Sequence, residues 1–453
     1  MINIKNYISD NVPSNKISSR LIEAIEKMGY TLPIDEAINE FQKKLGLPSV
    51  ENSVPNKRQF FEIQYMKNRL RENSGDIWNS FFRFGNNNYC ILKVIEKSEE
   101  DTRKSKTDKC SIDLCFIILD DNIAEIEMIL EKFKTNISAI KQWKEYKKIS
   151  ETFNELSKSY SAPVFTSKDY LIAKSLYEPE LLNILMSIKS SGGLLRRDAL
   201  AKFDKITDSS KHFLELIKLN LLKSEYVVLC KKTSEQINKA PSKESINLMG
   251  EHGIKCSRCN RLITDETIEE YLTATEIANE MLDGSKWMTI NLVETLLNLG
   301  ITEEDILVNI TQGPEEIDAI VSIGDEIVLF ELKDSQFSLG HAYAFQSRLG
   351  LYEAETGVIW ASKGVAPEVK EHFNKVKPDA EICYIESNES LWPLLLKIIE
   401  ELRWGILERE LSSLAITGIV ISNIPGGIIE DIKEKSKQMQ NINYEEVAAS
   451  AQT

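Results

Sequence analysis

One stretch constrains the fold of this 453-residue chain more than any other, namely Glu315 to Asp334, EEIDAIVSIGDEIVLFELKD. Apolar and more polar residues alternate from Ile317 to Ile323, Gly324-Asp325 supplies a turn signal, and a largely apolar run from Ile327 to Leu332 follows. This order is typical of a β-hairpin. We therefore expect two antiparallel strands that are buried on at least one face.

Three charged residues interrupt this hairpin: Asp318 on the first strand, and Glu331 and Lys333 on the second. Side chains alternate with a period of two, so Glu331 and Lys333 share a face, and strand pairing can bring Asp318 beside Glu331. Burying three charges is costly unless they pair or hold a metal. Two carboxylates suit Mg²⁺ (or Mn²⁺), which would bind together with a substrate phosphate. Lys333 would stabilise charge on that phosphate or act on a metal-bound water.

These residues resemble the Asp…Glu-x-Lys motif of the PD-(D/E)XK, or restriction-endonuclease-like, nuclease superfamily. The resemblance covers roughly residues 285–386, where the predicted helix, hairpin, helix and strand match an αβββαβ core of which one strand is not evident. It implies metal-dependent phosphodiester hydrolysis, with Asp318 and Glu331 as metal ligands and Lys333 as the catalytic lysine. It further implies that Glu294 adds an acid to the metal site and that Gln346 is a polar residue of the following helix.

An alternative interpretation is an exposed hairpin that carries Glu and Lys for solubility alone. Leu329, Phe330 and Leu332 favour burial of the second strand and argue against that alternative.

The length favours two to four domains, and the composition is that of a globular protein. A net charge of −15 does not favour a protein that coats nucleic acid indiscriminately, although one basic face could still bind DNA. Seven scattered cysteines predict a reducing, cytoplasmic environment rather than a disulfide framework. We see no signal peptide and no apolar stretch of about 20 residues, so we expect no membrane insertion.

Residues 1–150 predict an N-terminal α/β module of unknown role. Helical periodicity is expected at 17–45 and near 58–71, strands at YCILKVIE and SIDLCFIILD, and a long helix from Ile123 to Tyr146. The serine-rich segment 147–168 is the first domain boundary.

Residues 170–264 predict three short helices and a strand, and this order resembles a winged helix-turn-helix. Basic residues outnumber acids here, which favours contact with DNA phosphates. The candidate DNA-binding residues are Arg196, Arg197, Lys202, Lys211 and Lys218. Winged helices also dock onto proteins, and lysines also solvate helix faces, so both alternatives stay open.

Cys256 and Cys259 have the spacing of a zinc knuckle. Tetrahedral zinc needs two further ligands, for which Cys230 and His252 are the candidates. The alternative is two free cysteines in a turn. A zinc ion here would be structural.

Residues 265–410 form the predicted nuclease-like domain, which begins with an acidic helix at 265–282. Residues 411–453 form a C-terminal extension. The sequence thus predicts a multidomain α+β protein that acts as a metal-dependent DNA endonuclease in antiviral defence or DNA repair. The alternatives are a non-catalytic DNA-binding or regulatory protein with a nuclease-like scaffold, and a nuclease subunit of a larger complex. We expect a homodimer or larger assembly, with the helix 391–411 and the segment 414–429 as candidate contacts, and a protein partner is a further expectation.

Overall fold

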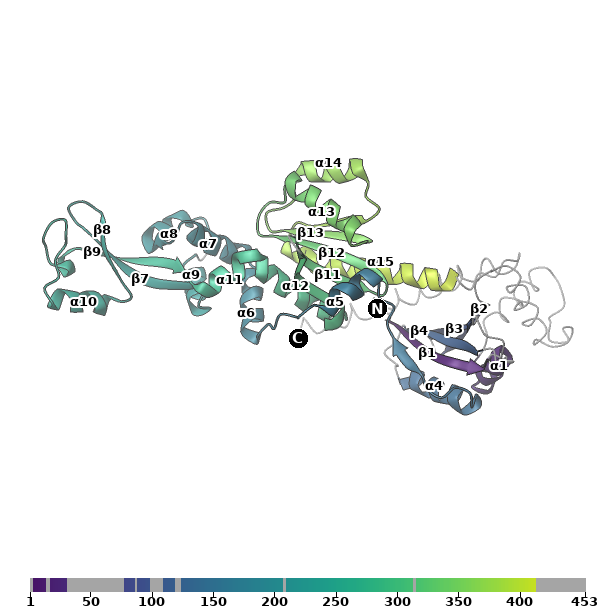
Figure 1. Ribbon diagram of the computed structural model, residues 1–453. Helices are drawn as coiled ribbons and strands as arrows, with labels where there is room; N and C mark the ends of the chain where they lie inside the picture. Colours follow the sequence, from purple (N-terminus) through teal and green to yellow (C-terminus); the bar gives the residue numbers. More distant parts are fainter. Residues whose placement is uncertain are drawn as a thin grey trace. The chain divides into compact units, whose positions relative to one another are not determined.

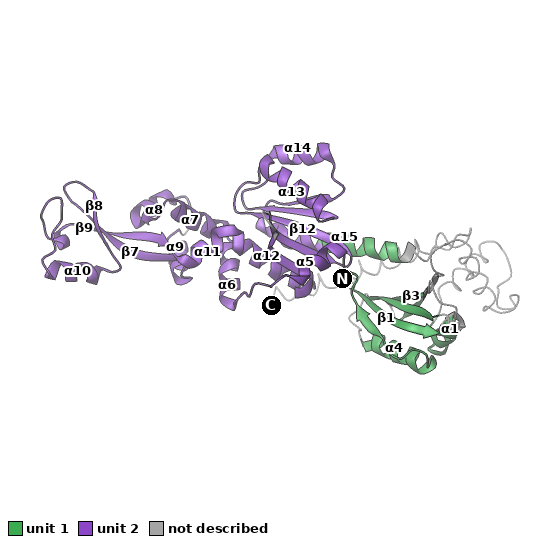
Figure 2. Cartoon of the chain, viewed as in Figure 1, with its two compact units in different colours: residues 1–149, 397–453 green, residues 150–396 purple. Residues whose placement is uncertain are grey.

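The computed structural model describes residues 3–13, 17–30, 77–85, 88–97, 109–118, 124–206, 209–312 and 315–412 (Figure 1). The chain divides into two compact units, residues 1–149 with 397–453 and residues 150–396 (Figure 2). The helix predicted near 58–71 and the segment 414–429 lie outside the described residues.

The first unit is built on an antiparallel sheet with the strand order β2-β3-β4-β1-β5. Its strands are β1 (Asn3–Pro13), β2 (Ile77–Phe84), β3 (Asn88–Lys97), β4 (Lys109–Ile118) and β5 (Lys144–Tyr146). Helices α1 (Ile17–Lys27) and α4 (Ala124–Asn136) share one apolar core with the sheet, in which Phe82, Phe116 and Phe133 are fully buried. Burial of these aromatic side chains stabilises the unit by removing large apolar areas from water.

The helix predicted from Ile123 to Tyr146 is shorter than expected and ends at Asn136. Ile137 and Ile140, whose spacing favoured a longer helix, are buried in the same core from an irregular segment. Trp143 then donates its indole N–H to the Leu130 carbonyl (3.1 Å), and the chain continues as β5 beside β1. Tertiary contacts thus replace the last turns of the predicted helix.

Helix α15 (Leu391–Ser412) belongs to both units, since the division falls before Lys397. Within the first unit its Glu410 lies between two lysines: Lys93 of β3, at 2.5 Å, and Lys148. Most apolar residues of α15 are buried within the chain, whereas Trp392 is 45% exposed, so the dimer contact expected at this helix stays a prediction. Its buried residues are Leu391, Leu395, Ile398, Ile399, Ile406 and Leu407.

The second unit begins with α5 (Glu151–Lys158) and α6 (Ser167–Leu176), followed by a winged-helix-like arrangement of helices and a sheet. The helices are α7 (Pro179–Ser190), α8 (Arg196–Lys202) and α9 (Ser209–Lys218). The sheet has the order β6-β9-β7-β8, with β6 (Leu194–Leu195), β7 (Leu222–Leu229), β8 (Gln236–Ala240) and β9 (Thr267–Ala274). Helix α10 (Lys243–Glu251) lies between β8 and β9 in the sequence.

The acidic helix predicted at 265–282 is wrong over its first half, where β9 forms instead, followed by the short helix α11 (Glu276–Leu282). Strand β9 pairs with β7 over eight residue pairs and with β6 over two. The ladder satisfies the backbone groups of Thr267–Ala274, and its acids remain partly exposed. This four-stranded sheet therefore extends to Ala274, beyond the predicted domain boundary at residue 264.

The remaining elements form a mixed sheet with the order β10-β11-β12-β13-β14. The first three strands are antiparallel and the last two run parallel to β12. In chain order the elements are α12 (Lys286–Asn298), β10 (Ile306–Gln312), β11 (Glu315–Ile323), β12 (Glu326–Lys333), α13 (Leu339–Leu351), β13 (Thr356–Ala361), α14 (Pro367–Val376) and β14 (Glu381–Ile385).

The predicted hairpin forms as β11 and β12, with Gly324 in the left-handed region (φ 65°) at the turn. Strand β10 is the strand that the sequence did not reveal. Asn309 has a left-handed φ of 52° and forms no ladder pair, although the register with β11 is the same on both sides of it. The predicted multidomain α+β fold is confirmed, with helices and strands interleaved along the chain and three separate sheets in the described residues.

Candidate active site and metal centre

The hairpin register brings Asp318 and Glu331 together. The registered pair farthest from the turn is Ala319 with Phe330, so Asp318 and Glu331 are the next residues of the two strands. The N–H of Leu332 donates to Asp318 Oδ2 at 2.7 Å and holds this carboxylate against β12. Both acids thus occupy the end of the hairpin ladder, as expected.

Two cations flank the Glu331 carboxylate, whose side chain is 3% exposed. Lys333 Nζ lies 3.1 Å from Oε1, and Arg348 Nη1 of α13 lies 2.8 Å from Oε2. Arg348 also donates to the carbonyl of Glu316 on β11 at 2.9 Å. Each oxygen of Glu331 therefore faces a positive charge.

The electrostatics of the site follow from this burial. Desolvation, and secondly the neighbouring Glu331 charge, raise the pKa of Asp318 to about 6. Burial lowers the pKa of Lys333, but the charges of Glu331 and Asp318 outweigh it and raise that pKa above its ordinary value. Lys333 is accordingly a cation at neutral pH, so it is suited to stabilise negative charge and not to remove a proton from water.

Arg348 is a residue that sequence reasoning missed. Gln346, the polar residue expected from α13, instead uses its Oε1 to accept a hydrogen bond from His372 Nε2 of α14 (2.7 Å). The signal for Arg348 was present, since it is the only lysine or arginine in α13. Its contact with Glu331 depends on how α13 packs on the sheet, which the sequence pattern does not specify.

Glu294 of α12 is partly buried, and its charge contributes to raising the pKa of Tyr170 on α6. The groups described around Asp318 are Glu331, Leu332, Lys333 and Arg348. The described interactions of Glu294 thus lead toward α6, and its expected role as a third metal-site acid gains no support from them.

Asp334 is a further carboxylate at the end of β12. Its Oδ1 accepts the indole N–H of Trp287, at the start of α12, at 2.6 Å. Burial raises the pKa of Asp334 to about 6. Because side chains alternate along β12, Asp334 points away from the face that carries Glu331 and Lys333, and its visible role is to fix α12 to the sheet.

The predicted DNA-binding residues differ in whether they already form ion pairs within the chain. Arg196 is bound by both oxygens of Glu270 on β9 (2.9 and 2.8 Å), and Arg197 pairs with Glu269 (2.8 Å). These two guanidinium groups are committed to intramolecular ion pairs. Lys202 donates to Ser187 Oγ (2.6 Å) and is exposed.

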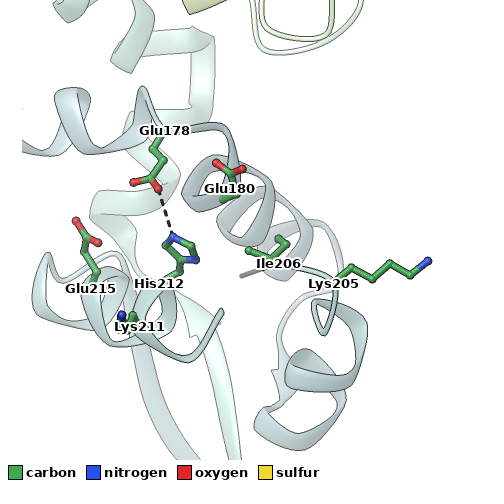
Figure 3. A pocket seen from close by; sticks show the side chains of 7 residues that line it. All are labelled: Glu178, Glu180, Lys205, Ile206, Lys211, His212 and Glu215. Carbon is green, nitrogen blue, oxygen red and sulfur yellow. Dashed lines mark hydrogen bonds and ion pairs between the residues drawn. The ribbon is translucent and has the colours of Figure 1, made fainter. Parts of the chain in front are cut away.

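Lys211 and Lys218 are exposed on α9, and the same helix carries the carboxylate of Glu215. A hollow of about 500 Å³ lies beside α7, α9 and the segment that follows α8, and Figure 3 shows the side chains that line it. The His212 ring lies 3.3 Å from Glu178 there. The lining of the hollow is of mixed charge: Glu178, Glu180, Lys205, Ile206, Lys211, His212 and Glu215. This face of the third helix is not uniformly positive, in contrast to the basic surface expected from the sequence.

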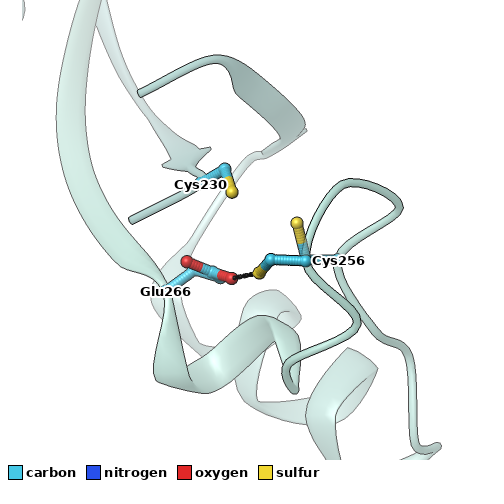
Figure 4. Close-up of side chains that lie close together, drawn as sticks. Cys230, Cys256 and Glu266 are labelled. Carbon is cyan, nitrogen blue, oxygen red and sulfur yellow. Dashed lines mark hydrogen bonds between the residues drawn. The ribbon is translucent and has the colours of Figure 1, made fainter. Parts of the chain in front are cut away.

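A second cluster of chemically capable side chains lies at the base of the β7–β9 connection (Figure 4). One potential ligand atom each from Cys230, Cys256, Cys259 and Glu266 lies within 4.8 Å of the others. The Cys259 thiol donates to Glu266 Oε1 (2.7 Å), which raises the pKa of Cys259 to about 12. Hydrogen bonds from the Thr233 hydroxyl and nearby backbone N–H groups lower the pKa of Cys230 to about 7. This group could bind a metal ion.

His252 does not belong to this cluster, which corrects its prediction as a ligand. Helix α10 continues to Glu251, and His252 caps its end as an exposed residue before the chain turns at Gly253 (φ 71°). Glu266 takes the fourth place. No pattern of the CxxC type indicates a carboxylate seven residues after the second cysteine, so Glu266 could not be found from the sequence.

Comparisons with known proteins add little. No protein-family model and no curated protein matches the chain. A solved structure, the crystal structure of protein VC1899 from Vibrio cholerae, aligns with 13% identity over 57% of this chain and a TM-score of 0.31. The chain covers 64% of that structure, which is less than two thirds of its length. A similarity of this size carries no argument about function.

The described helices differ from a membrane span in the combination of length and apolar content. None of them is both long and apolar enough to cross a bilayer.

Proposed function

We propose that this chain is a metal-dependent DNA endonuclease whose active site consists of Asp318, Glu331 and Lys333. The observation that carries the proposal is the buried pair of carboxylates at the end of the β11–β12 hairpin, with the Lys333 ammonium 3.1 Å from Glu331. Without a metal the two acids and the cations Lys333 and Arg348 balance to zero net charge. A divalent ion would give the site an excess positive charge, which suits an anionic phosphodiester.

The residues present fit a Mg²⁺ or Mn²⁺ ion, because their donors are carboxylate oxygens and Asp318 is disfavoured as an isolated charge. Asp318 and Glu331 would hold the ion. When bound, it would activate water and polarise the scissile phosphate. Lys333, held protonated by its acidic neighbours, would stabilise the charge that develops on the phosphate oxygens.

The substrate class, DNA, is the less direct part of the proposal. It is supported by the winged-helix-like arrangement of α7, α8, α9 and their sheet, and by the exposed lysines Lys202, Lys211 and Lys218. The ion pairs of Arg196 and Arg197 with β9 favour a second candidate, in which this domain docks onto a protein and the chain acts as a regulatory or complex-bound subunit.

Cofactor identity and cellular setting are likewise proposals. We infer a structural zinc at the cysteine cluster, because thiolates favour zinc over Mg²⁺. A cytoplasmic location is consistent with seven free thiols. Defence against foreign DNA and DNA repair are both compatible with the proposed chemistry.

The test is cleavage of supercoiled plasmid by the purified chain with Mg²⁺ or Mn²⁺, and with EDTA as control. We expect metal-dependent nicking or linearisation that Asp318→Ala and Glu331→Ala each abolish. Glu316→Gln, an exposed acid on the same strand, is the matched control and should retain activity. Cleavage by Asp318→Ala at the wild-type rate would refute the assignment, and DNA binding without cleavage would favour the regulatory alternative.

A further inference from the structure

The cysteine cluster is built on two backbone turns of the same form, the Cys230 turn (residues 230–235) and the Cys256 turn (residues 256–261). In each, the cysteine N–H donates to the carbonyl five residues on, at 2.9 Å in the first and 2.7 Å in the second. The N–H of the residue four positions on donates back to the cysteine carbonyl, at 2.7 and 2.9 Å respectively. That residue, Ser234 or Asn260, is left-handed in both turns, with φ of 59° and 63°.

The two turns differ at their fourth position. The Cys256 turn has Cys259 there, whereas the Cys230 turn has Thr233. A backbone N–H also points at sulfur in the Cys256 turn, from Arg258 to Cys256 Sγ at 3.4 Å. Such N–H groups stabilise a thiolate, the form in which cysteine binds a metal. The turns therefore supply three of the four ligands that a tetrahedral site needs.

Glu266 is positioned to supply the fourth. The β7–β9 ladder ends with Leu229 opposite Thr267, so Cys230 and Glu266 are the next residues of the two strands. Glu266 is 4% exposed, and the Lys231 N–H holds its Oε2 at 2.6 Å while Cys259 donates to its Oε1. Burying the Glu266 carboxylate beside the thiols costs free energy, and coordination of a metal ion would offset that cost.

The insert between β7 and β9, residues 230–266, has little apolar burial of its own. The core associated with it contains four buried residues, Val228, Ala240, Ile246 and Ile263. A segment of about 40 residues with so small a core usually depends on a metal or a disulfide. The cysteines are free thiols, which leaves the metal.

We propose that Cys230, Cys256, Cys259 and Glu266 form a Cys₃Glu zinc site that clamps the two ends of this insert to the Cys256 turn and is required for the insert to fold. Three thiolates select zinc over Mg²⁺, and four protein ligands leave no open position for catalysis. The zinc site thus determines the shape of the wing and takes no part in the hairpin chemistry.

The ligand set is tested by zinc content and affinity. The full chain, purified without added metal, should contain about one zinc per chain by elemental analysis. Glu266→Ala should weaken zinc affinity at least about tenfold in competition with a chromophoric chelator, since even indirect partners of a metal site contribute that much. His252→Ala is the matched control and should bind zinc as the wild type does.

Because the two turns have the same backbone form, a second substitution should restore zinc binding to Glu266→Ala. Thr233→Cys places a fourth thiol at the position that Cys259 occupies in the other turn, so Glu266→Ala with Thr233→Cys should regain zinc affinity. Substitution with Co²⁺ should then show a stronger thiolate charge-transfer absorption than the wild type, reporting four sulfur ligands. Chelation should expose the insert, but not the β10–β14 domain, to limited proteolysis.

Absence of zinc from the wild-type chain, or unchanged affinity in Glu266→Ala together with loss in His252→Ala, would overturn the proposal. An insert that stays protease-resistant after chelation would refute the clamp. None of these measurements depends on cleavage of DNA, so failure of the zinc site and failure of the proposed nuclease function are distinguished.

Discussion

Glu331 is almost completely buried and contacts two cations, so the stability of its ionised carboxylate depends on both of them. Lys333 and Arg348 face its two oxygens, and no apolar residue could take the place of either without leaving charge uncompensated. A metal ion that binds Glu331 must share it with these cations. Arg348 therefore both holds the ligand in place and competes with the metal for it.

Replacing Arg348 with Met tests that competition. In metal-free protein the variant should lose about 2 to 4 kcal/mol of stability, because a buried carboxylate loses one of its two partners. Saturating Mg²⁺ should then raise the melting temperature of Arg348→Met more than that of the wild type, since the ion replaces the missing charge. Thermal melts with and without Mg²⁺ measure this, and equal shifts in the two proteins would contradict it.

Asp318 provides a second prediction, from pH. Its folded-state pKa of about 6 lies above the ordinary value of 3.8, so the folded chain binds this proton more tightly than the unfolded chain does. The resulting stability is fully present below about pH 4 and is lost as the pH rises through about 6. At pH 8 the ionised Asp318 thus lowers the free energy of unfolding.

Asp318→Asn removes that charge and keeps an acceptor for the Leu332 N–H. In EDTA we expect the variant to be more stable than the wild type at pH 8, by about 1 to 3 kcal/mol, while binding of Mg²⁺ is lost. The gain should shrink at pH 5. Melting curves at the two pH values provide the measurement. A gain that is independent of pH would show that the charge of Asp318 does not destabilise the folded chain.

At the scale of elements, the site depends on α13 lying close against the parallel strand β13. Gly357 makes this approach possible: a Cβ atom there would lie 2.8 Å from Leu349 and 2.9 Å from Phe345 of α13. Glycine is needed for contact and not for backbone conformation. The position of Arg348 over Glu331 therefore depends on a residue in another element.

Gly357→Ala should destabilise the chain by about 1 to 3 kcal/mol through overpacking. Gly350, on α13 itself, has open space around its Cα, so Gly350→Ala should instead stabilise the helix by about 0.5 to 1 kcal/mol. Urea unfolding of both variants measures the contrast. A neutral Gly357→Ala would mean that α13 can move outward without cost.

At the scale of the molecule, one proposed site cuts one strand, because in-line attack requires a metal, a water and a lysine at a single phosphate. Double-strand cleavage then needs two copies of the chain. Most apolar residues of α15 are already buried, and the segment 414–429 lies outside the described residues, so the contact itself stays a prediction.

A mixing experiment tests the pairing of sites. Titrating wild-type protein with Glu331→Ala should shift the plasmid product from linear to nicked, and light scattering should give the mass of at least a dimer. A monomer that linearises plasmid without a nicked intermediate would contradict the pairing.

Signals between residues close in the sequence were sufficient to predict the hairpin and the turn of the cysteine pair. The turn at Gly324, the alternation around it and the two-residue spacing of Glu331 and Lys333 predicted the hairpin and its charged end. Cys256 and Cys259 likewise marked a turn suited to metal. Such features depend on local backbone periods, which any chain with these residues would follow.

Only the tertiary structure decided which distant residues complete each site. Arg348 reaches Glu331 through the packing of α13, and Glu266 reaches the cysteines because β7 and β9 pair in one register. In the same way β9 forms where the isolated sequence favoured a helix, since its partner strand lies about 40 residues away. Long-range pairing depends on the summed burial and hydrogen bonding of whole elements, which no short window of sequence contains.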